Sequence, residues 1–336
     1  MAKKKVLKKS VKKAPKTKVK ASKPPKKAVA TKAKPKNSPK AAVKSKAKPV
    51  QSNAPAAKSH SPSALPLIKP IDKALLSLNS KTAAENYDEF QHDWEITDII
   101  KENPASILRV DMAHCNPGSL YDDPYTPEAL HFAEEQLAVL RGQGLFKEIG
   151  NFYYVYQIKV KNRTGKSQIG LGAYVNTRSI WDERENAGGK IIRNEAIFAH
   201  KAEGRAKLIQ TLRAIIGTVN LAAPDPKGEL EKNLRAIIQS CPKPDIESTD
   251  RKGDTHQVWV VNEKAAVEKL TSLYRDLEVY VADGNHRSKA AQMIGLPWFL
   301  AVIFCGETMN IDPYHRLLAD LPFAPDFFIK ELEKQK

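Results

Sequence analysis

Apolar residues at helical spacing predict three amphipathic helices. After Thr126 and Pro127, which suit a helix N-cap and first turn, apolar residues recur three or four positions apart, at Leu130, Ala133, Leu137 and Leu140. The same spacing runs through residues 202–216, which Gly217 follows as a helix-ending residue, and through residues 263–277. We expect the apolar face of each helix to pack on a core.

Alternating polar and apolar residues predict strands between these helices. Every second residue from 152 to 160 is apolar or aromatic, and residues 168–176 follow a turn at 162–165, so the two segments predict a β-hairpin. Residues 105–110 come after the helix-stopping pair Asn103-Pro104 and predict another strand.

Residues 224–254 contain clusters of Pro, Gly, Asp and Lys around a short helical piece at 229–239. We interpret this segment as a partly ordered insertion. Because helices, strands and hairpin signals are intermixed along the chain, we predict an α+β domain with a mixed sheet and packed helices.

The N-terminal tail differs in composition from the rest of the 336-residue chain. Its first 60 residues contain 21 lysines, seven prolines and no Asp or Glu, whereas the remaining residues carry 34 Lys and Arg against 38 Asp and Glu. The formal net charge of +17 therefore comes from the tail. Like-charge repulsion, proline and scarce apolar surface predict disorder over residues 1–65, ahead of a folded domain at 66–336.

The lysines of the tail predict association with nucleic acid. Lysine-rich segments release counterions when they lie along phosphates, which gives sequence-independent binding that weakens with salt. The tail resembles the lysine/alanine/proline tails of linker histones and bacterial histone-like proteins. A solvated tail with no dedicated partner is the alternative, and a lipid surface is less favoured because no amphipathic or aromatic anchor accompanies the charge.

Composition also excludes several classes of protein. No window of about 18 apolar residues is present to span a membrane. The three cysteines, Cys115, Cys241 and Cys305, are too far apart to form a disulfide framework or a paired-cysteine zinc site. The chain start lacks the apolar stretch of a secretory signal, and a tail without arginine argues against a mitochondrial transit peptide. We therefore expect a cytoplasmic protein, associated with the nucleoid if its tail binds DNA.

The most informative stretch for chemistry is Asp283-Gly284-Asn285-His286-Arg287. An apolar strand is predicted to end at Asp283, Gly284 allows a sharp turn, and a helix is predicted to begin near Arg287, ahead of a strand at 298–304. Unpaired amides at a helix N-terminus favour an anionic oxygen, and His286 and Arg287 add donors. Asp283 is expected to cap the helix, to hold His286 or Arg287, or to bind a divalent cation that accompanies a nucleotide.

Two further clusters are weaker candidates. Arg193, Glu195 and Arg205 form either ordinary surface ion pairs or a site in which the arginines clamp phosphates while Glu195 accepts a proton. Asp88, in an acidic stretch at the start of the folded part, is either a helix cap or a second candidate base.

Other motifs do not carry a site. Residues 164–167 end like a phosphate-binding Walker loop, but the earlier glycine is missing and a strand follows. Residues 170–172 lack the third glycine of a dinucleotide fingerprint. His114 and Cys115 have no partner at metal-ligand spacing, so we assign them to the core or to the end of a strand.

The order of these motifs resembles the bacterial family of domain of unknown function 1015 over roughly residues 80–320. Nine short matches carry the resemblance, among them 87–88, 103–110, 192–195, 281–287 and 314–318. The Asp-Gly-x-His-Arg element is also similar to that of free serine kinases of the ParB/sulfiredoxin-like superfamily, which place nucleotide phosphates at this loop. The resemblance therefore implies a ParB/sulfiredoxin-like core.

The chain departs from that family pattern at two positions and at its end. Asn285 stands where the family has His, and Asn194 stands where the family has the central His of Arg-His-Glu. Asparagine keeps hydrogen bonding but cannot shuttle a proton, so weakened catalysis is one expectation. The resemblance also leads us to expect a further C-terminal region in relatives, where this sequence continues for about 20 residues after His315.

The resemblance implies a phosphotransferase that uses ATP or ADP with Mg²⁺ to phosphorylate free L-serine. In that scheme Gly284, Asn285, His286 and Arg287 bind the phosphates, and Asp283 holds Mg²⁺ or Arg287. Arg193 and Arg205 neutralise developing charge, and Glu195 or Asp88 serves as the base. The alternative is a non-enzymatic, ParB-like or histone-like nucleic-acid-binding protein with a degenerate nucleotide pocket.

Overall fold

The computed structural model describes residues 65–78, 80–83, 90–161, 167–181, 188–310 and 324–334, and the structural statements below concern these residues. Four sequence predictions lie outside them, namely the tail up to residue 64, the candidate base Asp88, the turn at 162–165 and the family-like motif at 314–318.

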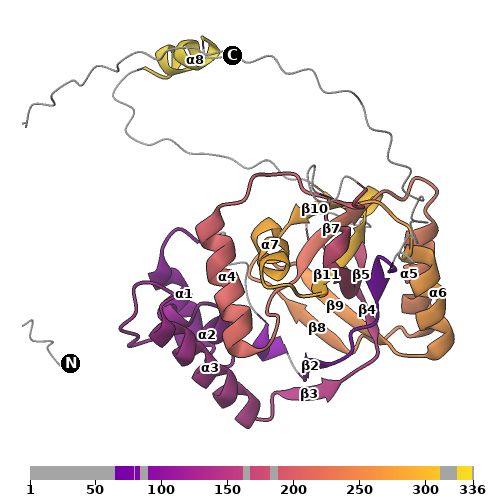
Figure 1. The fold of residues 1–336 in the computed structure, drawn as a ribbon, viewed down its shortest axis with the longest axis horizontal. Helices are drawn as coiled ribbons and strands as arrows, with labels where there is room; N and C mark the ends of the chain where they lie inside the picture. The colour runs from indigo at the N-terminus through magenta and orange to yellow at the C-terminus, as the bar shows by residue number, and fades with distance from the viewer. Residues whose placement is uncertain are drawn as a thin grey trace, which may run out of the picture. The chain divides into compact units, whose positions relative to one another are not determined.

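The centre of the fold is a mixed nine-stranded sheet (Figure 1). Its order is β6 (Ile191–Ile192), β10 (Val279–Asp283), β7 (Val219–Ala223), β11 (Trp298–Cys305), β5 (Ser167–Asn176), β4 (Tyr153–Lys159), β9 (Thr255–Val261) and β8 (Ile246–Thr249). A short strand, β1 (Ile68–Lys69), also pairs with β5. Strand β10 runs parallel to β6 and antiparallel to β7, while β7 runs parallel to β11. The predicted α+β class with a mixed sheet is confirmed.

The predicted hairpin is present, with β4 antiparallel to β5 and Tyr154 paired with Gly172. The ring of Tyr154 occupies the space that a side chain at Gly172 would need, because a Cβ there would lie 2.0 Å from the ring. The other face of β4 provides fully buried Tyr153 and Val155 to the core. The alternation therefore predicts the strand correctly. One face of β4 packs in the main core, and the other places Tyr154 over Gly172 of β5.

Helices α5 (Glu229–Ser240), α6 (Lys264–Tyr274) and α7 (Asn285–Met293) contribute side chains to the same large core cluster as the sheet. The prediction for residues 263–277 is largely confirmed, since Glu263 caps α6 and Leu270 and Tyr274 are buried. Burying these apolar side chains supplies most of the stabilisation of such a layer, at about 25 cal/mol per Å².

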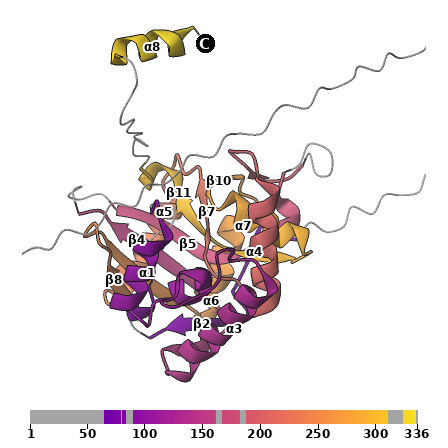
Figure 2. The ribbon, with the colours of Figure 1, turned by 90° about the vertical axis from the view of Figure 1, so that its left-hand side faces the viewer.

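A second group of helices packs beside α7. It comprises α1 (Asp93–Glu102), α2 (Leu108–Asp111), α3 (Pro127–Gly142) and α4 (Ala199–Leu212). Helix α4 contacts both α7 and α3, and Figure 2 views the molecule from the side that carries α1, α2 and α3. As predicted, Thr126 caps α3, and its four apolar residues at helical spacing are buried.

The prediction of a strand at residues 105–110 is wrong, because this segment forms a turn and the short helix α2. The Ser106 hydroxyl accepts a hydrogen bond from the Leu108 amide at 3.2 Å, which favours a helical start. Leu108 and Val110 are then buried in two different helical clusters. Tertiary packing has outweighed the β-branched composition.

The helix predicted at 202–216 starts at Ala199 and ends at Leu212, four residues before the predicted end. Arg213 adopts the left-handed conformation with φ 50°, so the helix cannot continue through it. Gly217 also has positive φ, but it lies in the loop that leads to β7.

The interpretation of residues 224–254 as a partly ordered insertion is also wrong. Helix α5 places Leu230 and Leu234 in the main core, and β8 pairs antiparallel with β9 at the edge of the sheet. The Pro, Gly, Asp and Lys clusters form the connections between these elements.

The remaining elements are small. A separate two-stranded sheet joins β2 (Ala74–Ser77) to β3 (Phe146–Ile149), and 3-10 turns occur at Ser80–Thr82, Ala113–Cys115, Thr177–Ser179 and Gly306–Thr308. Helix α8 (Pro325–Glu333) exposes Phe327, Ile329 and Leu332. Within the part of the chain that the structure describes, none of the helices has the length and apolarity needed to cross a lipid bilayer.

Candidate functional site

The segment from Asp283 to Arg287 forms a strand, a tight turn and a helix N-terminus. Strand β10 ends at Asp283 as predicted, and α7 begins at Asn285, two residues before the predicted start near Arg287. Gly284 adopts φ 92°, a conformation that glycine tolerates best. A Cβ at this position would lie 3.1 Å from the Cα atom of Val219, so glycine also permits close contact with β7.

Asn285 connects the two sequence clusters that were predicted separately. Its side chain is buried, with 1% of the residue exposed, and Nδ2 donates to Oδ1 of Asn194 at 2.8 Å and to Oε1 of Glu195 at 3.1 Å. Oδ1 of Asn285 is also buried, and among the described residues it has no hydrogen-bond partner. The structure therefore brings residues 194–195 to the N-terminus of α7, as the phosphate-site hypothesis requires.

His286 contacts the segment that leads into α4. Its Nε2 atom accepts a hydrogen bond from the Phe198 amide at 3.1 Å, and the two rings stack with centroids 5.9 Å apart. Because Nε2 acts as an acceptor, the ring is neutral in this arrangement and carries its proton on Nδ1. Phe198 is 69% exposed, so this stacked pair forms part of the surface.

Arg287 connects the end of β10 to the start of β7. One guanidinium nitrogen donates to Oδ2 of Asp283 at 2.8 Å, and another donates to the backbone carbonyl of Thr218. Asp283 thus holds Arg287, which is one of the three roles expected for it.

Arg205 lies near Arg287 but is anchored by a different carboxylate. It forms an ion pair with Asp111, and the two side chains are 11% and 9% exposed. Burial and, to a smaller extent, the positive charge of Arg287 together lower the pKa of Arg205 to about 10. Two guanidinium groups therefore repel each other at this point, which favours a bound anion.

The Arg193 side chain, predicted to clamp phosphates, contacts the C-terminal part of α7. One of its guanidinium nitrogens donates to Oε1 of Gln292 at 3.5 Å. Gln292 is in the last turn of α7, seven residues beyond Asn285, which corresponds to about 10 Å along a helix. This contact places one guanidinium nitrogen of Arg193 near the last turn of α7, while the neighbouring Asn194 contacts Asn285 at the start of the helix.

A small cavity of about 20 Å³, room for about one water molecule, lies beside these arginines between α4, α7 and β11. Arg205 and Arg287 line it together with apolar side chains, including Leu208, Leu212, Ile215, Ile216 and Phe299. At this volume the cavity admits a water molecule but not a nucleotide.

The candidate magnesium role of Asp283 has no support from neighbouring ligands. Among the described residues, Asp283 belongs to no cluster of three His, Cys, Asp or Glu side chains. Any magnesium ion at Asp283 would depend on phosphate oxygens and water for its other ligands. Of the two candidate bases, only Glu195 is described, and its Oε1 is held by Asn285.

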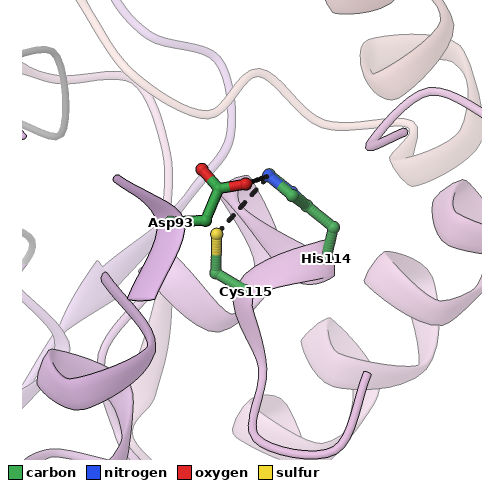
Figure 3. A group of neighbouring side chains, drawn as sticks. All are labelled: Asp93, His114 and Cys115. Atoms are coloured by element: carbon green, nitrogen blue, oxygen red, sulfur yellow. Dashed lines mark hydrogen bonds and ion pairs between the residues drawn. The ribbon is translucent and has the colours of Figure 1, made fainter. Parts of the chain in front are cut away.

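Sequence reasoning missed two groups of residues. Asp111, the partner of Arg205, adjoins the segment that was assigned to a strand, so its role could not be seen. Cys115 is buried in a core cluster, as predicted, but nothing in the sequence indicated that the fold places Asp93 beside His114 and Cys115 (Figure 3). Asp93 is the first residue of α1, where an acidic residue ordinarily indicates only helix stabilisation.

Comparison with known proteins gives one match. A family model described as a protein of unknown function, DUF1015, matches residues 68–336. None of the curated proteins and none of the solved structures matches the chain.

Proposed function

The chain belongs to the DUF1015 family of proteins of unknown function, and from its candidate site we propose that it is a nucleotide-dependent phosphotransferase. ATP or ADP is the proposed donor, with Mg²⁺ as the counter-ion of its phosphates. Free L-serine is the proposed acceptor, on the basis of the resemblance to free serine kinases.

The main support for this proposal is a pair of hydrogen bonds at the N-terminus of α7. The side chain of Asn285 donates to Asn194 and to Glu195, which brings these two residues to the start of the helix. The first amides of a helix have no acceptor within the helix, and they lie at the positive end of its dipole. Helix α7 has no acidic residue in its first turn to occupy that position. A phosphate there would accept from the amides and would also reduce the repulsion between Arg205 and Arg287.

The two asparagines that depart from the family pattern contact each other. Asn285 donates to Asn194 and to Glu195, so the departures form one local change and not two unrelated ones. An amide pair keeps its hydrogen bonds at any ordinary pH, whereas paired imidazoles would titrate near neutrality. We therefore assign Asn285 the role of positioning Glu195, and Glu195 the role of accepting the proton from the acceptor hydroxyl.

The arginines have unequal roles in this proposal. Arg287 is nearest to the α7 amides and contacts the phosphates, and Arg205 contributes positive charge from its fixed position against Asp111. Arg193 supports the far end of α7 through Gln292. Phosphoryl transfer needs little more than such positioning and charge stabilisation.

The decisive experiment measures nucleotide binding and phosphoserine formation with the full chain. ATP and ADP are titrated by calorimetry with and without Mg²⁺, and phosphoserine is detected by ³¹P NMR. Arg287→Ala should weaken nucleotide binding by about 10- to 100-fold, which corresponds to loss of a charge-assisted hydrogen bond. Arg235→Ala is the matched control, since Arg235 also forms an i,i+4 ion pair, with Glu231 on α5.

The outcomes separate binding from catalysis. If the wild-type protein binds neither nucleotide, or if both variants behave alike, the proposed site is wrong. If the wild-type protein binds nucleotide but forms no phosphoserine with either donor, the kinase assignment fails and a nucleotide-binding role remains.

A second function is proposed for the tail, which carries 21 lysines and no acidic residue in the first 60 positions. We propose that it binds nucleic acid without sequence preference. The affinity of the full chain for duplex DNA should fall linearly with salt on a double-logarithmic plot, with a slope of about −0.9 per neutralised phosphate. A variant lacking residues 1–60 should lose most of this affinity and slope, and an unchanged slope would remove the tail from the interaction.

A further inference from the structure

We propose that Asp93, His114 and Cys115 form a binding site for a divalent transition metal of the zinc class. The three side chains come from the start of α1 and from the 3-10 turn Ala113–Cys115, and Figure 3 shows them turned toward one another. None of them belongs to the phosphate site at α7.

The distances between the side chains fit the dimensions of a zinc centre. Sγ of Cys115 lies 3.4 Å from Nε2 of His114, and Oδ2 of Asp93 lies 3.6 Å from the same nitrogen. All three candidate ligand atoms lie within 4.8 Å of one another. Tetrahedral zinc, with ligand bonds of about 2.0 to 2.3 Å, separates its ligand atoms by about 3.4 to 3.6 Å. The two distances to Nε2 therefore match the spacing of zinc ligands, and Sγ and Oδ2 lie within 4.8 Å of each other.

The three atoms also converge in direction. Both the thiol of Cys115 and the carboxylate of Asp93 approach the same ring nitrogen of His114. A single donor nitrogen cannot point its one proton at two acceptors equally well, whereas a cation near Nε2 satisfies all three groups at once.

The surrounding charge favours a cation. Asp93 has no lysine or arginine partner in the described segments of the chain, and its contact with His114 is its only ion pair there. Asp123 adds a second negative charge that acts on His114.

The donor types select the class of metal. A thiolate, an imidazole and a carboxylate suit Zn²⁺ and its neighbours in the transition series, whereas Mg²⁺ and Ca²⁺ prefer oxygen ligands alone. Three protein ligands leave the fourth position of a tetrahedron to water or another small ligand. Asp93 has a side chain 68% exposed and provides the route by which the ion enters.

Binding would connect α1 to the turn that follows α2. Both elements belong to a small cluster of buried side chains, Ile96, Ile99, Ile100, Leu108 and Cys115, which is separate from the main core. Cys115 would lose its thiol proton to the solvent when the metal–sulfur bond forms, and the ion would then stabilise the packing of this cluster.

The alternative is that Cys115 is simply an apolar core residue and that Asp93 forms a surface hydrogen bond with His114. The full chain, freed of metal with a chelator, is therefore titrated with Co²⁺ and observed by absorption spectroscopy. One equivalent should produce a thiolate-to-cobalt charge-transfer band and visible bands of tetrahedral intensity. Zn²⁺ added afterwards should displace the cobalt and abolish these bands.

Cysteine variants identify the sulfur ligand. Cys115→Ser should abolish the charge-transfer band, whereas Cys241→Ser and Cys305→Ser, the exposed and buried controls, should retain it. The proposal is overturned if the wild-type protein shows no such band, or if the band survives in Cys115→Ser.

A carboxylate variant keeps the proposal testable if Cys115→Ser does not fold. Asp93→Asn changes one exposed group and should weaken Zn²⁺ binding by about tenfold or more, measured by competition with a chromogenic chelator. Asp98→Asn, at another exposed carboxylate of α1, should leave the affinity unchanged. Equal affinities of the two variants would exclude Asp93 as a ligand and overturn the proposed site.

Discussion

Helices α5 and α7 begin in nearly the same way and differ in how their N-termini are neutralised. Each follows a strand of the main sheet, and each has a left-handed glycine as its N-cap, Gly228 for α5 and Gly284 for α7. Both therefore present unpaired amides at the positive end of a helix dipole.

In α5 the protein itself supplies the negative charge. Asp225 accepts a hydrogen bond from the Glu231 amide at 2.9 Å, and Glu229 and Glu231 both lie in the first turn. In α7 the first turn has no acidic residue, and it contains His286 and Arg287 instead. The only nearby carboxylate of β10, at Asp283, is directed to the guanidinium of Arg287.

This difference shows which helix N-terminus serves stability and which is available to a ligand. A carboxylate placed on the first turn, as in α5, stabilises the helix by about 0.5 to 2 kcal/mol. Helix α7 has no carboxylate on its own first turn, which carries His286 and Arg287, and the Glu195 carboxylate reaches this end of the helix only through the side chain of Asn285. The pattern is the one expected of a binding site, where local stability is given up for function.

The largest effect should come from the two glycines. Gly284→Ala should lower the free energy of unfolding by about 2 to 4 kcal/mol, because a Cβ at φ 92° would also lie 3.1 Å from the Val219 backbone. Gly228→Ala should cost only about 1 kcal/mol, since no atom lies within 4 Å of its new Cβ. Urea unfolding of both variants measures the difference, and equal losses would show that close packing at Gly284 is unimportant.

A smaller effect should separate the two aspartates. Asp225→Ala should lower the free energy of unfolding by about 1 to 2 kcal/mol, because the Glu231 amide loses its acceptor in a buried position. Asp283→Ala should cost about 0.5 kcal/mol or less, since it removes an exposed i,i+4 ion pair. The two losses are compared by urea unfolding at neutral pH. A reversal of this order would contradict the proposed difference between the helices.

Asp283→Ala should also strengthen binding of inorganic phosphate by a few-fold in the absence of Mg²⁺. The reason is that Arg287 would no longer be paired with the carboxylate of Asp283. Calorimetric titration with phosphate measures the change, with Asp276→Ala as a control at an exposed ion pair elsewhere. Weaker phosphate binding would mean that Asp283 holds Arg287 in the position that binds the anion.

The smallest effect concerns α6, where the side chain of Glu263 accepts hydrogen bonds from the amides of Ala265 and Ala266. These bonds lower the pKa of Glu263 from its ordinary value of 4.5. Its stabilising contribution is therefore present above about pH 4.5 and is lost as the pH falls through the lower folded-state pKa. The difference in unfolding free energy between wild type and Glu263→Gln should shrink below that pH. A difference that is constant with pH would exclude the charged cap.

The sequence predicted those elements whose side chains repeat regularly. Helix α3 and the β4–β5 hairpin were located from residue spacing, because each buries one face against the core, and the succession of β10, α7 and β11 was located from apolar runs and turn residues. Residues 105–110 were wrongly assigned to a strand. Leu108 and Val110 are buried by the four-residue helix α2, which is too short for apolar residues to repeat at helical spacing. The order of strands in the sheet was not predicted, because pairing depends on contacts distant in sequence.

The candidate site was predicted in part. Residue type and a turn signal were enough to place Asp283, Gly284 and Arg287 at a helix N-terminus, and the structure adds the contacts of Asn285 with Asn194 and Glu195. The positions of Arg193 and Arg205 could not be read from the sequence. Their partners, Gln292 and Asp111, are each more than 90 residues away along the chain.

The hydrogen bond from Arg287 to the Thr218 carbonyl has a spectroscopic consequence. A ligand that draws the guanidinium toward itself must release this carbonyl, and the peptide unit between Thr218 and Val219 then changes its electronic environment. Selective ¹³C and ¹⁵N labelling of that one unit would give an NMR signal that reports occupancy at α7 for unlabelled ligands. The peptide unit at the start of β7 would therefore report ligand binding at α7, although β7 itself has no proposed catalytic residue.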